Sequence, residues 1–379
     1  MEIYVLQGDA GSGKTTFILQ KLTHVPPACR LAPTGRAAWI INGQTIHKAL
    51  GIDCKPTLQA QYVTSLVIDE ASMVGATLFG HIVAFVERSH KTIPIYLVGD
   101  WRQLPPVQDE PIWKHPKFWP NVKQVTIREM SYRCAHSEML ARLARGTLLP
   151  HDYAKLKSRV ISTLPPASSD TICLYFKRIS ARVRTVEAAQ YHGSGPLYTF
   201  KADDREKITE DEEDMPIPQC VQLRDGHRVV LKRTLDQKMG LVNGALGTVT
   251  RIWGDHTDGT GEHVEVLFKN DIKIMIYPTP FGARTQIPLV PAYAMTIHSA
   301  QGLTLESAVH VDLEGMQDPA LAYVAFSRVR TPDMLTITHL PSHESLNTQN
   351  PDRALFIQRL CARTVLSSSQ AYPTTYAQA

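Results

Sequence analysis

The sequence lacks the patterns that mark secreted or membrane-bound proteins. Its 379 residues include only six cysteines, and no two of them form a Cys-X-X-Cys pair. This spacing argues against a disulfide scaffold and against a structural zinc site. No apolar run approaches membrane-spanning length, and Met1–Gly8 predicts a buried strand rather than a signal peptide. We therefore expect a soluble, intracellular protein with reduced thiols and no membrane partner.

A large excess of one charge is also missing. Lysine and arginine number 40 against 36 acidic residues, which gives a net charge of +4. That balance does not by itself require a polyanionic partner, although it allows a local basic groove. The apolar fraction of 43% over this length predicts two or three domains, each with a packed core.

Short β-rich runs alternate with helix-like segments in much of the chain. Three clear runs are EIYVLQG (2–8), SLVIDEA (65–71) and IPIYLVGD (93–100), and each ends in glycine or acidic residues. Such alternation is typical of an α/β fold with a parallel sheet and crossover helices. Ligands of such sheets bind where the strands end, so the polar residues there are candidates for a site.

The middle and the end of the chain differ from this pattern. The stretch 202–214 is strongly acidic, and 223–285 is β-rich with Asn-Gly and glycine turns, which predicts a small inserted antiparallel barrel. Residues 346–379 are rich in Ser, Thr, Pro and Gln and predict a flexible tail with one short helix around RALFIQRL. The predicted sections are 1–125, then 126–222 with 286–345, the barrel at 223–285, and the tail.

The clearest motif is GDAGSGKT, Gly8 to Thr15, which fits the pattern GxxxxGK[ST]. It follows a predicted strand and opens a predicted helix, the context in which backbone N–H groups wrap phosphates. Lys14 is expected to reach the β- and γ-phosphates, and the Thr15 hydroxyl to bind Mg²⁺. The residues predicted to hold the nucleotide are Gly8, Ala10, Gly11, Ser12, Gly13, Lys14, Thr15 and Thr16.

Two later strand ends complete this predicted ATP site. LVIDEAS places Asp69 and Glu70 directly after a hydrophobic strand. Asp69 suits the Mg²⁺ shell, and Glu70 suits orienting and polarising the attacking water. In LVGDWRQLPPV, Gln103 stands where a neutral polar group can sense the γ-phosphate. Taken alone, this last segment also fits a proline-rich surface turn.

Together the motifs resemble superfamily 1 helicases of group B, most closely the Pif and RecD type. The resemblance covers about residues 5–338 and is carried by eight segments in order: GDAGSGKT, APTGRAA, TIHKALG, LVIDEAS, VGDWRQLPPV, SYRCAHSEMLARLARG, TIHSAQGLTL and YVAFSRVR. It implies two RecA-like P-loop lobes, with the small β-barrel inserted in the second lobe. It also implies an ATP-dependent, Mg²⁺-requiring 5′–3′ DNA helicase or translocase.

The same resemblance assigns roles to further residues. Arg133 and Arg328 would reach the γ-phosphate, where an arginine can be worth ~10³-fold in rate, and Gln301 and Gly302 would lie near the same phosphate. Single-stranded DNA would contact residues of both lobes: Thr34, Thr45, His47, Thr296 and His298. The implied partners are single-stranded and forked duplex DNA, with replication proteins as further candidates, and the implied oligomeric state is a monomer.

The sequence departs from the family pattern at three places. Ser299 stands where lysine is more frequent, and the wedge insertion at 53–64 is short, which predicts weak unwinding. No glutamine-bearing segment precedes the phosphate loop, and Gln7 lies inside a strand, so selectivity for the nucleotide base is open. In the helix FKRISARVRTVEAA, three arginines (Arg178, Arg182 and Arg184) fit a nucleic-acid channel or a solvated face equally well.

Several other readings compete with the DNA helicase. A related viral RNA helicase differs mainly in recognising the 2′-hydroxyl, which the sequence does not show. A nucleic-acid-stimulated ATPase with weak unwinding fits the same motifs. A scaffold with a vestigial ATPase is opposed by the intact motif residues, and a P-loop kinase or GTPase would not need the second-lobe arginines. A hydrolase built on His298 and Ser299 is disfavoured because no G-x-S-x-G elbow surrounds the serine.

Overall fold

The chain forms two compact units. A computed structural model describes residues 1–22, 28–52, 55–128, 135–168, 170–205, 215, 217–255 and 257–364. The first unit consists of residues 1–33, 41–137 and the stretch from 349 onward, and the second consists of residues 34–40 and 138–348. The division between them thus falls inside helix α6 (Ala135–Arg145), downstream of the boundary predicted after residue 125.

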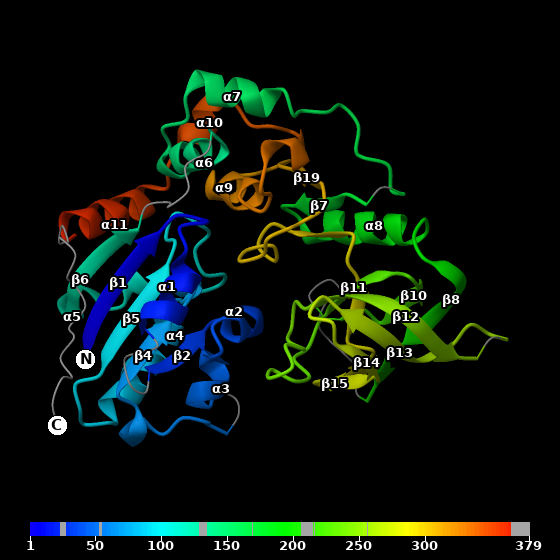
Figure 1. The fold of residues 1–379 in the computed structure, drawn as a ribbon, viewed down its shortest axis with the longest axis horizontal. Coiled ribbons are helices and arrows are strands. Elements are labelled where there is room, and N and C mark those ends of the chain that lie inside the picture. The colour runs from blue at the N-terminus through cyan, green and yellow to red at the C-terminus, as the bar shows by residue number, and fades with distance from the viewer. Residues whose placement is uncertain are drawn as a thin grey trace. The chain divides into compact units, whose positions relative to one another are not determined.

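A six-stranded parallel sheet forms the core of the first unit, in the order β3-β2-β4-β5-β1-β6 (Figure 1). The strands are β1 (Glu2–Gly8), β2 (Ala28–Ala32), β3 (Gln44–Thr45), β4 (Ser65–Ile68), β5 (Pro94–Gly99) and β6 (Val122–Arg128). In register, Val5 lies between Leu97 and Val125. All four residues of β4 are buried, as expected for an apolar run covered on both faces.

Helices cover this sheet and close the first unit. They are α1 (Lys14–Lys21), α3 (Ile46–Leu50), α4 (Ala76–Glu87), α5 (Phe118–Asn121) and α11 (Pro351–Ala362). Helix α11 contains the short helix predicted near the end of the chain. It is capped by the Asn350 side chain, with Pro351 in its first turn. The helix extends the predicted stretch RALFIQRL by two residues at each end.

Aromatic packing explains why α11 is ordered. Phe356 and Leu360 are buried in the core of the first unit. The Phe356 ring stacks on Trp113 with 4.1 Å between centroids, and the Arg359 guanidinium lies 3.9 Å above the Trp119 ring. These partners are more than 200 residues away in the sequence, so local composition could not reveal them.

The second unit contains a four-stranded parallel sheet in the order β18-β7-β19-β20. Its strands are β7 (Ile172–Tyr175), β18 (Ala294–Thr296), β19 (Val309–Asp312) and β20 (Leu335–Thr338). The helices of this unit are α2 (Gly35–Ile40), most of α6, α7 (Pro150–Lys157), α8 (Arg178–Ala189), α9 (Ala320–Phe326) and α10 (His343–Asn347). Two parallel sheets, one in each unit, match the two lobes expected from the motifs.

The β-rich part of the second unit is wider than predicted. It runs from Ser194 to Pro291, whereas 223–285 was expected. Its five-stranded sheet has the order β14-β13-β12-β11-β17, and β10-β8 and β15-β16-β9 are separate small sheets. The strands are β8 (Ser194–Lys201), β9 (Asp203–Asp204), β10 (Cys220–Asp225), β11 (Arg228–Leu231), β12 (Leu246–Gly254), β13 (Gly261–Phe268), β14 (Lys273–Ile276), β15 (Thr279–Phe281), β16 (Arg284–Gln286) and β17 (Leu289–Pro291). Tyr198 and Phe200 share one core with Val264 and Leu289, which fixes the upstream strands in this part.

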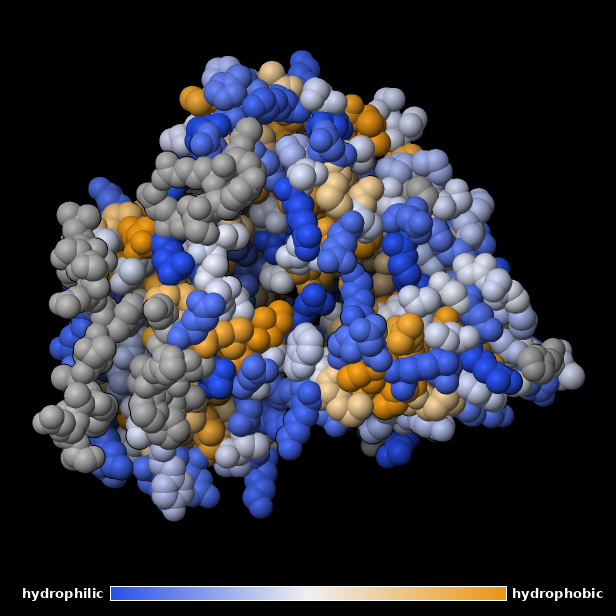
Figure 2. Space-filling view, in the orientation of Figure 1, coloured by the Kyte–Doolittle hydropathy of each residue, from blue (hydrophilic) through white to orange (hydrophobic). Residues whose placement is uncertain are grey.

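The described surface shows no membrane-spanning element. No helix among the described residues is both long and apolar enough to cross a bilayer. In the face drawn in Figure 2, hydrophilic side chains cover most of the surface and apolar ones lie in separate patches.

Candidate nucleotide and nucleic-acid sites

The phosphate loop connects the end of β1 to the start of α1. Gly11 and Gly13 have left-handed backbones, with φ of 77° and 74°, which suits glycine at both positions. A Cβ at Gly8 would lie 2.4 Å from the Ser12 Oγ, so a side chain there would not fit. Lys14 Nζ donates to the carbonyls of Gly8 at 2.8 Å and Asp9 at 3.1 Å. These two contacts hold the Lys14 ammonium group against the backbone of the phosphate loop.

The predicted metal ligands are adjacent in the first unit. Asp69, at the end of β4, is buried and interacts with the Thr15 hydroxyl. The pKa of Asp69 is raised to about 7, mainly by burial and next by the charge of Glu70, while the Glu70 backbone N–H, Lys14 and Thr15 oppose the shift. Glu70 has a left-handed backbone with φ of 50°, which is strained for a residue that is not glycine.

A buried polar network supports Gln103. Its Nε2 donates to Asp100 Oδ2 at 3.2 Å, and Gln7 Nε2 donates to Asp100 Oδ1 at 3.0 Å. Gln7 Oε1 in turn accepts from the Trp101 backbone at 2.9 Å. Gln103 is thus part of the sheet edge and not of a surface turn. Sequence reasoning missed Asp100, although its place directly after a buried strand was a usable signal.

Two buried oxygen atoms at this edge have no hydrogen-bond partner in the part of the chain that the structure describes. They are Glu70 Oε2 and Gln103 Oε1, and Ser12 Oγ in the phosphate loop shares this property. Buried polar atoms normally have a partner, and exceptions often mark a site for a ligand, an ion or water. Their position around Lys14 and Asp69 fits a bound nucleotide with its metal.

The predicted phosphate contacts of the second unit lie in one local structure. Arg328 follows α9 and is buried, and its Nε donates to the Val324 carbonyl at 2.8 Å. Its Nη1 donates to the Leu303 carbonyl at 3.0 Å, directly after Gln301 and Gly302. Gly302 has φ of 74°, and the buried Gln301 Nε2 has no partner among the described residues. Arg133 lies outside the described residues.

The three threonines predicted to contact DNA share one geometry. Each accepts, through its hydroxyl oxygen, a hydrogen bond from the backbone N–H three residues later. The acceptor–donor pairs are Thr34 with Ala37 at 3.2 Å, Thr45 with Lys48 at 3.4 Å, and Thr296 with Ser299 at 3.2 Å. In Thr34 and Thr45 this leaves the O–H proton to donate elsewhere, whereas the Thr296 hydroxyl also pairs with the Ser299 hydroxyl.

The two histidines of these loops have different surroundings. His47 is exposed, whereas His298 is half-buried. Burial, and next the charge of Arg178, lower the pKa of His298, while Asp318 opposes the shift. Ser299 pairs with Thr296, with 2.8 Å between the hydroxyl oxygens, so the structure gives no support to a His298–Ser299 hydrolase pair.

A cluster of cations lies beside His298 in the second unit. Burial is the main reason for the lowered pKa of Lys232, and the charges of Arg182 and Arg178 lower it further. Arg184, by contrast, is buried and pairs with Glu187 at 2.9 Å and with the Pro165 carbonyl. Of the three helix arginines, Arg184 thus has a structural role. Lys232 was missed because it lies in the β-rich part.

Most of the five tryptophans have structural roles. Trp101 is fully buried, and Trp113 and Trp119 pack against the core of the first unit. Trp253 stacks on His263 with 5.1 Å between centroids, and Trp39 is 36% exposed.

Two family descriptions match the sequence. An AAA domain matches residues 1–145, and the 2B domain of the DNA helicase Pif1 matches residues 213–252. Among curated proteins, the ATP-dependent DNA helicase PIF1 of Homo sapiens is 29% identical over 86% of this chain and 56% of its own length. The ATP-dependent DNA helicase Pif1 of Bdellovibrio bacteriovorus is 27% identical over 86% of this chain and 82% of its own length. The chain thus spans little more than half of the human relative.

Solved structures share the fold. Pif1 helicase from Candida albicans has a TM-score of 0.76 at 20% identity, covering 95% of this chain and 96% of its own. Bacteroides Pif1 bound to single-stranded DNA has a TM-score of 0.76 at 21% identity, covering 95% and 93%. The two parallel sheets and the antiparallel β-rich part are therefore two RecA-like lobes with a 2B-type domain.

Proposed function

We propose that this chain belongs to the Pif type of group B in superfamily 1 and that it is an ATP-dependent 5′–3′ DNA helicase or translocase. Hydrolysis of ATP between the lobes would drive movement on single-stranded DNA and unwinding of forked duplexes. The observation that carries the proposal is the set of polar atoms around Lys14 and Asp69 in the first unit, combined with threonine-capped loops in both units. The helicase activities of the similar proteins from Homo sapiens and Bdellovibrio bacteriovorus support the same proposal.

The nucleotide half of the proposal rests on the chemistry of the donor set. Thr15 and Asp69 supply a hydroxyl and a carboxylate side by side, a suitable oxygen pair for Mg²⁺. When bound, that ion would neutralise charge on the phosphates. Lys14 would exchange its carbonyl contacts for phosphate oxygens, and Glu70 would accept a proton from the attacking water. Gln103, held by Asp100, would position that water or the γ-phosphate.

The second lobe would complete hydrolysis and couple it to DNA. Arg328 and Arg133 would stabilise charge on the γ-phosphate. Gln301 and Gly302 would lie near the same phosphate and link it to the loop that is proposed to contact DNA. Arg328 is bonded to the carbonyl of Leu303, so a movement of its guanidinium would pull on the Gln301 loop. That same loop begins at Thr296 and His298, which are proposed to contact DNA.

The nucleic-acid half rests on donors that ignore base identity. Thr34 and Thr45 each keep a hydroxyl proton for a phosphate oxygen, and the paired hydroxyls of Thr296 and Ser299 keep one between them. The cations Arg178, Arg182 and Lys232 add positive charge beside His298. Contacts of this kind fix a strand without reading its sequence. We propose single-stranded and forked duplex DNA as ligands and a monomer as the acting form.

The first test is ATP hydrolysis with single-stranded DNA, with single-stranded RNA and with neither. We expect strong stimulation by DNA, and Lys14→Ala should lose at least ~10²-fold of the rate because phosphate charge is no longer stabilised. Forked duplexes with only a 5′ or a 3′ tail then test polarity. Stimulation by RNA alone would favour an RNA helicase, and slow hydrolysis that ignores both polymers would oppose a motor.

A further inference from the structure

One arginine beside the phosphate loop has no role in the site described above. Arg128 is the last residue of β6, at the carboxyl edge of the first sheet. Its Nε donates to the Ser12 carbonyl at 3.3 Å, and its guanidinium lies 5.1 Å from the centre of the Phe17 ring. A Cβ on Gly13 would lie 3.9 Å from Arg128 Nη2. The side chain therefore lies along the phosphate loop and the first turn of α1.

Most of the hydrogen-bonding capacity of Arg128 is uncommitted. A guanidinium carries five N–H donors, and only the Nε contact with Ser12 is formed within the described part of the chain. No carboxylate there forms an ion pair with it, whereas the neighbouring Arg102 pairs with Asp9 at 2.7 Å. A half-buried arginine that faces a phosphate loop and lacks a counter-ion is well suited to bind an anionic ligand.

The order of the strands indicates which end of a nucleotide Arg128 would meet. Asp69 follows β4 and Gln103 follows β5, and both strands lie on one side of β1. Strand β6, with Arg128, lies on the other side of β1. The reacting γ-phosphate belongs near the carboxylates and Gln103, so the opposite side faces the portion that remains in ADP.

We propose that Arg128 is a nucleotide-binding residue that holds the α-phosphate and ribose portion, with Phe17 as the platform that orients its guanidinium. The inference rests on the proposed function, because it assumes that ATP occupies the phosphate loop. Because ATP and ADP share this portion, Arg128 contributes to binding of both and changes KM rather than kcat. Uniform binding of substrate and transition state has this kinetic signature.

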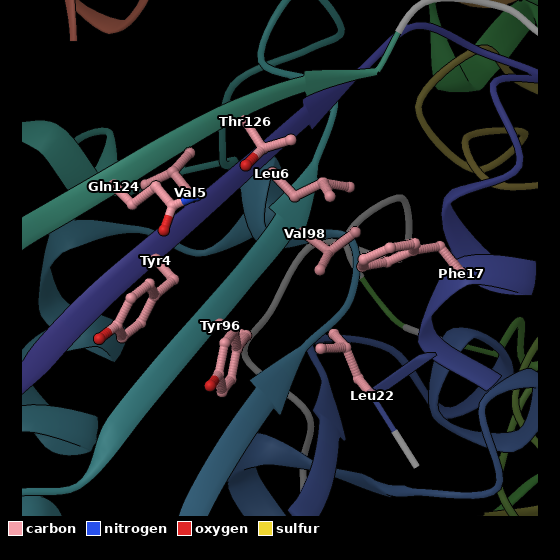
Figure 3. Close-up of a pocket in the computed structure, with 9 residues that line it drawn as sticks. All are labelled: Tyr4, Val5, Leu6, Phe17, Leu22, Tyr96, Val98, Gln124 and Thr126. Atoms are coloured by element: carbon pink, nitrogen blue, oxygen red, sulfur yellow. The ribbon is translucent and has the colours of Figure 1, made fainter. Parts of the chain in front are cut away.

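A purely structural role for Arg128 is the alternative. Residues 124, 126 and 128 share one face of β6, and Gln124 and Thr126 line a pocket with Phe17, Tyr4 and Tyr96 (Figure 3). Arg128 could simply cover Phe17 at the end of this pocket. In that case its removal would lower stability and leave nucleotide affinity unchanged.

The experiment measures binding of ADP and ATP to the full chain by fluorescent-nucleotide titration, together with KM and kcat. In Arg128→Ala we expect about tenfold weaker binding of both nucleotides and a KM raised to match, with kcat within about twofold. Arg128→Lys should recover part of the loss, and Phe17→Leu should lose about threefold. Lys123→Ala is the matched control, since it removes an exposed cation of the same strand and should bind normally.

The outcomes separate the alternatives. Unchanged ADP affinity in Arg128→Ala, with a lower unfolding midpoint measured without nucleotide, would overturn the inference and leave a structural role. Weaker ATP binding with normal ADP binding would also overturn it, because the contact would then be to the γ-phosphate. If the unsubstituted chain bound neither nucleotide, the proposed function itself would fail.

Discussion

The first and second units each contain a Thr-Ile-His segment, TIHKALG and TIHSAQG, and comparing them separates structure from function. Four matching positions have the same structural role in both units. The threonine hydroxyls accept from the backbone N–H three residues later, in Thr45 and Thr296. The isoleucines and alanines are fully buried, and the glycines have φ of 74°, at Ile46 and Ile297, Ala49 and Ala300, and Gly51 and Gly302. Both segments also start where a parallel strand ends. The repeat is therefore a small structural unit that presents a threonine and a histidine.

The positions that differ show how the copies diverged. Leu50 is part of the hydrophobic core of the first unit, but its counterpart Gln301 has a buried amide nitrogen that forms no hydrogen bond with any described residue. Lys48 and its counterpart Ser299 are both exposed. We infer that the first copy mainly binds nucleic acid, and that the second copy also couples nucleotide binding to nucleic-acid binding.

The largest expected effect tests whether both copies grip the same strand. His47→Ala and His298→Ala should each weaken binding of an oligo(dT) by about fivefold, the value of one hydrogen bond. The lowered pKa of His298 keeps it neutral at pH 7, so its loss removes a hydrogen bond and not a charge. Because the loops lie in separate units, the double variant should multiply the losses to about 25-fold. Fluorescence anisotropy measures this, and a double variant no weaker than either single one would contradict a shared strand.

A second change converts one copy into the other. Gln301→Leu introduces the residue found at position 50 and should reduce DNA-stimulated hydrolysis about tenfold, with a smaller change in DNA binding. Removing an unpaired buried amide should leave the unfolding midpoint equal or higher. The reciprocal Leu50→Gln is the control and should destabilise the protein by about 1–3 kcal/mol. Normal stimulation in Gln301→Leu would show that the amide carries no signal.

The smallest expected effect concerns charge. Ser299→Lys gives the second copy the cation that Lys48 supplies in the first, and should tighten single-stranded DNA binding about threefold at low salt. The slope of log affinity against log salt should steepen by about 0.7, as expected for one added phosphate contact. Lys48→Ser should have the opposite effect. An affinity gain without a change of slope would point to packing rather than to phosphate.

Much of the nucleotide site could be predicted because each of its parts is local. The phosphate loop, Asp69 and Glu70 are short motifs that directly follow apolar strands, and parallel strands bring their ends to one edge. Arg128 could not be predicted in the same way. Its importance depends on β6 lying next to β1, a pairing that no local pattern records.

The misjudged regions depended on distant partners. The β-rich part begins at Ser194 because Tyr198 and Phe200 pack with strands more than sixty residues later. Arg284 pairs with Asp204 at 2.8 Å across a similar separation. Arg184 looked like a surface cation, and only the fold shows that Glu187 and the Pro165 carbonyl hold it inside.

The return of α11 to the first unit has a consequence for biosynthesis. The sheet of that unit ends with β6 at Arg128, yet Phe356 and Leu360 emerge from the ribosome more than 220 residues later. At ~5–20 residues per second, the delay is about 10–45 s. During this time helix α11 is not yet available to pack on the aromatic rings of Trp113 and Trp119. We therefore expect the nascent first lobe to need a bound chaperone until the second lobe has been synthesised.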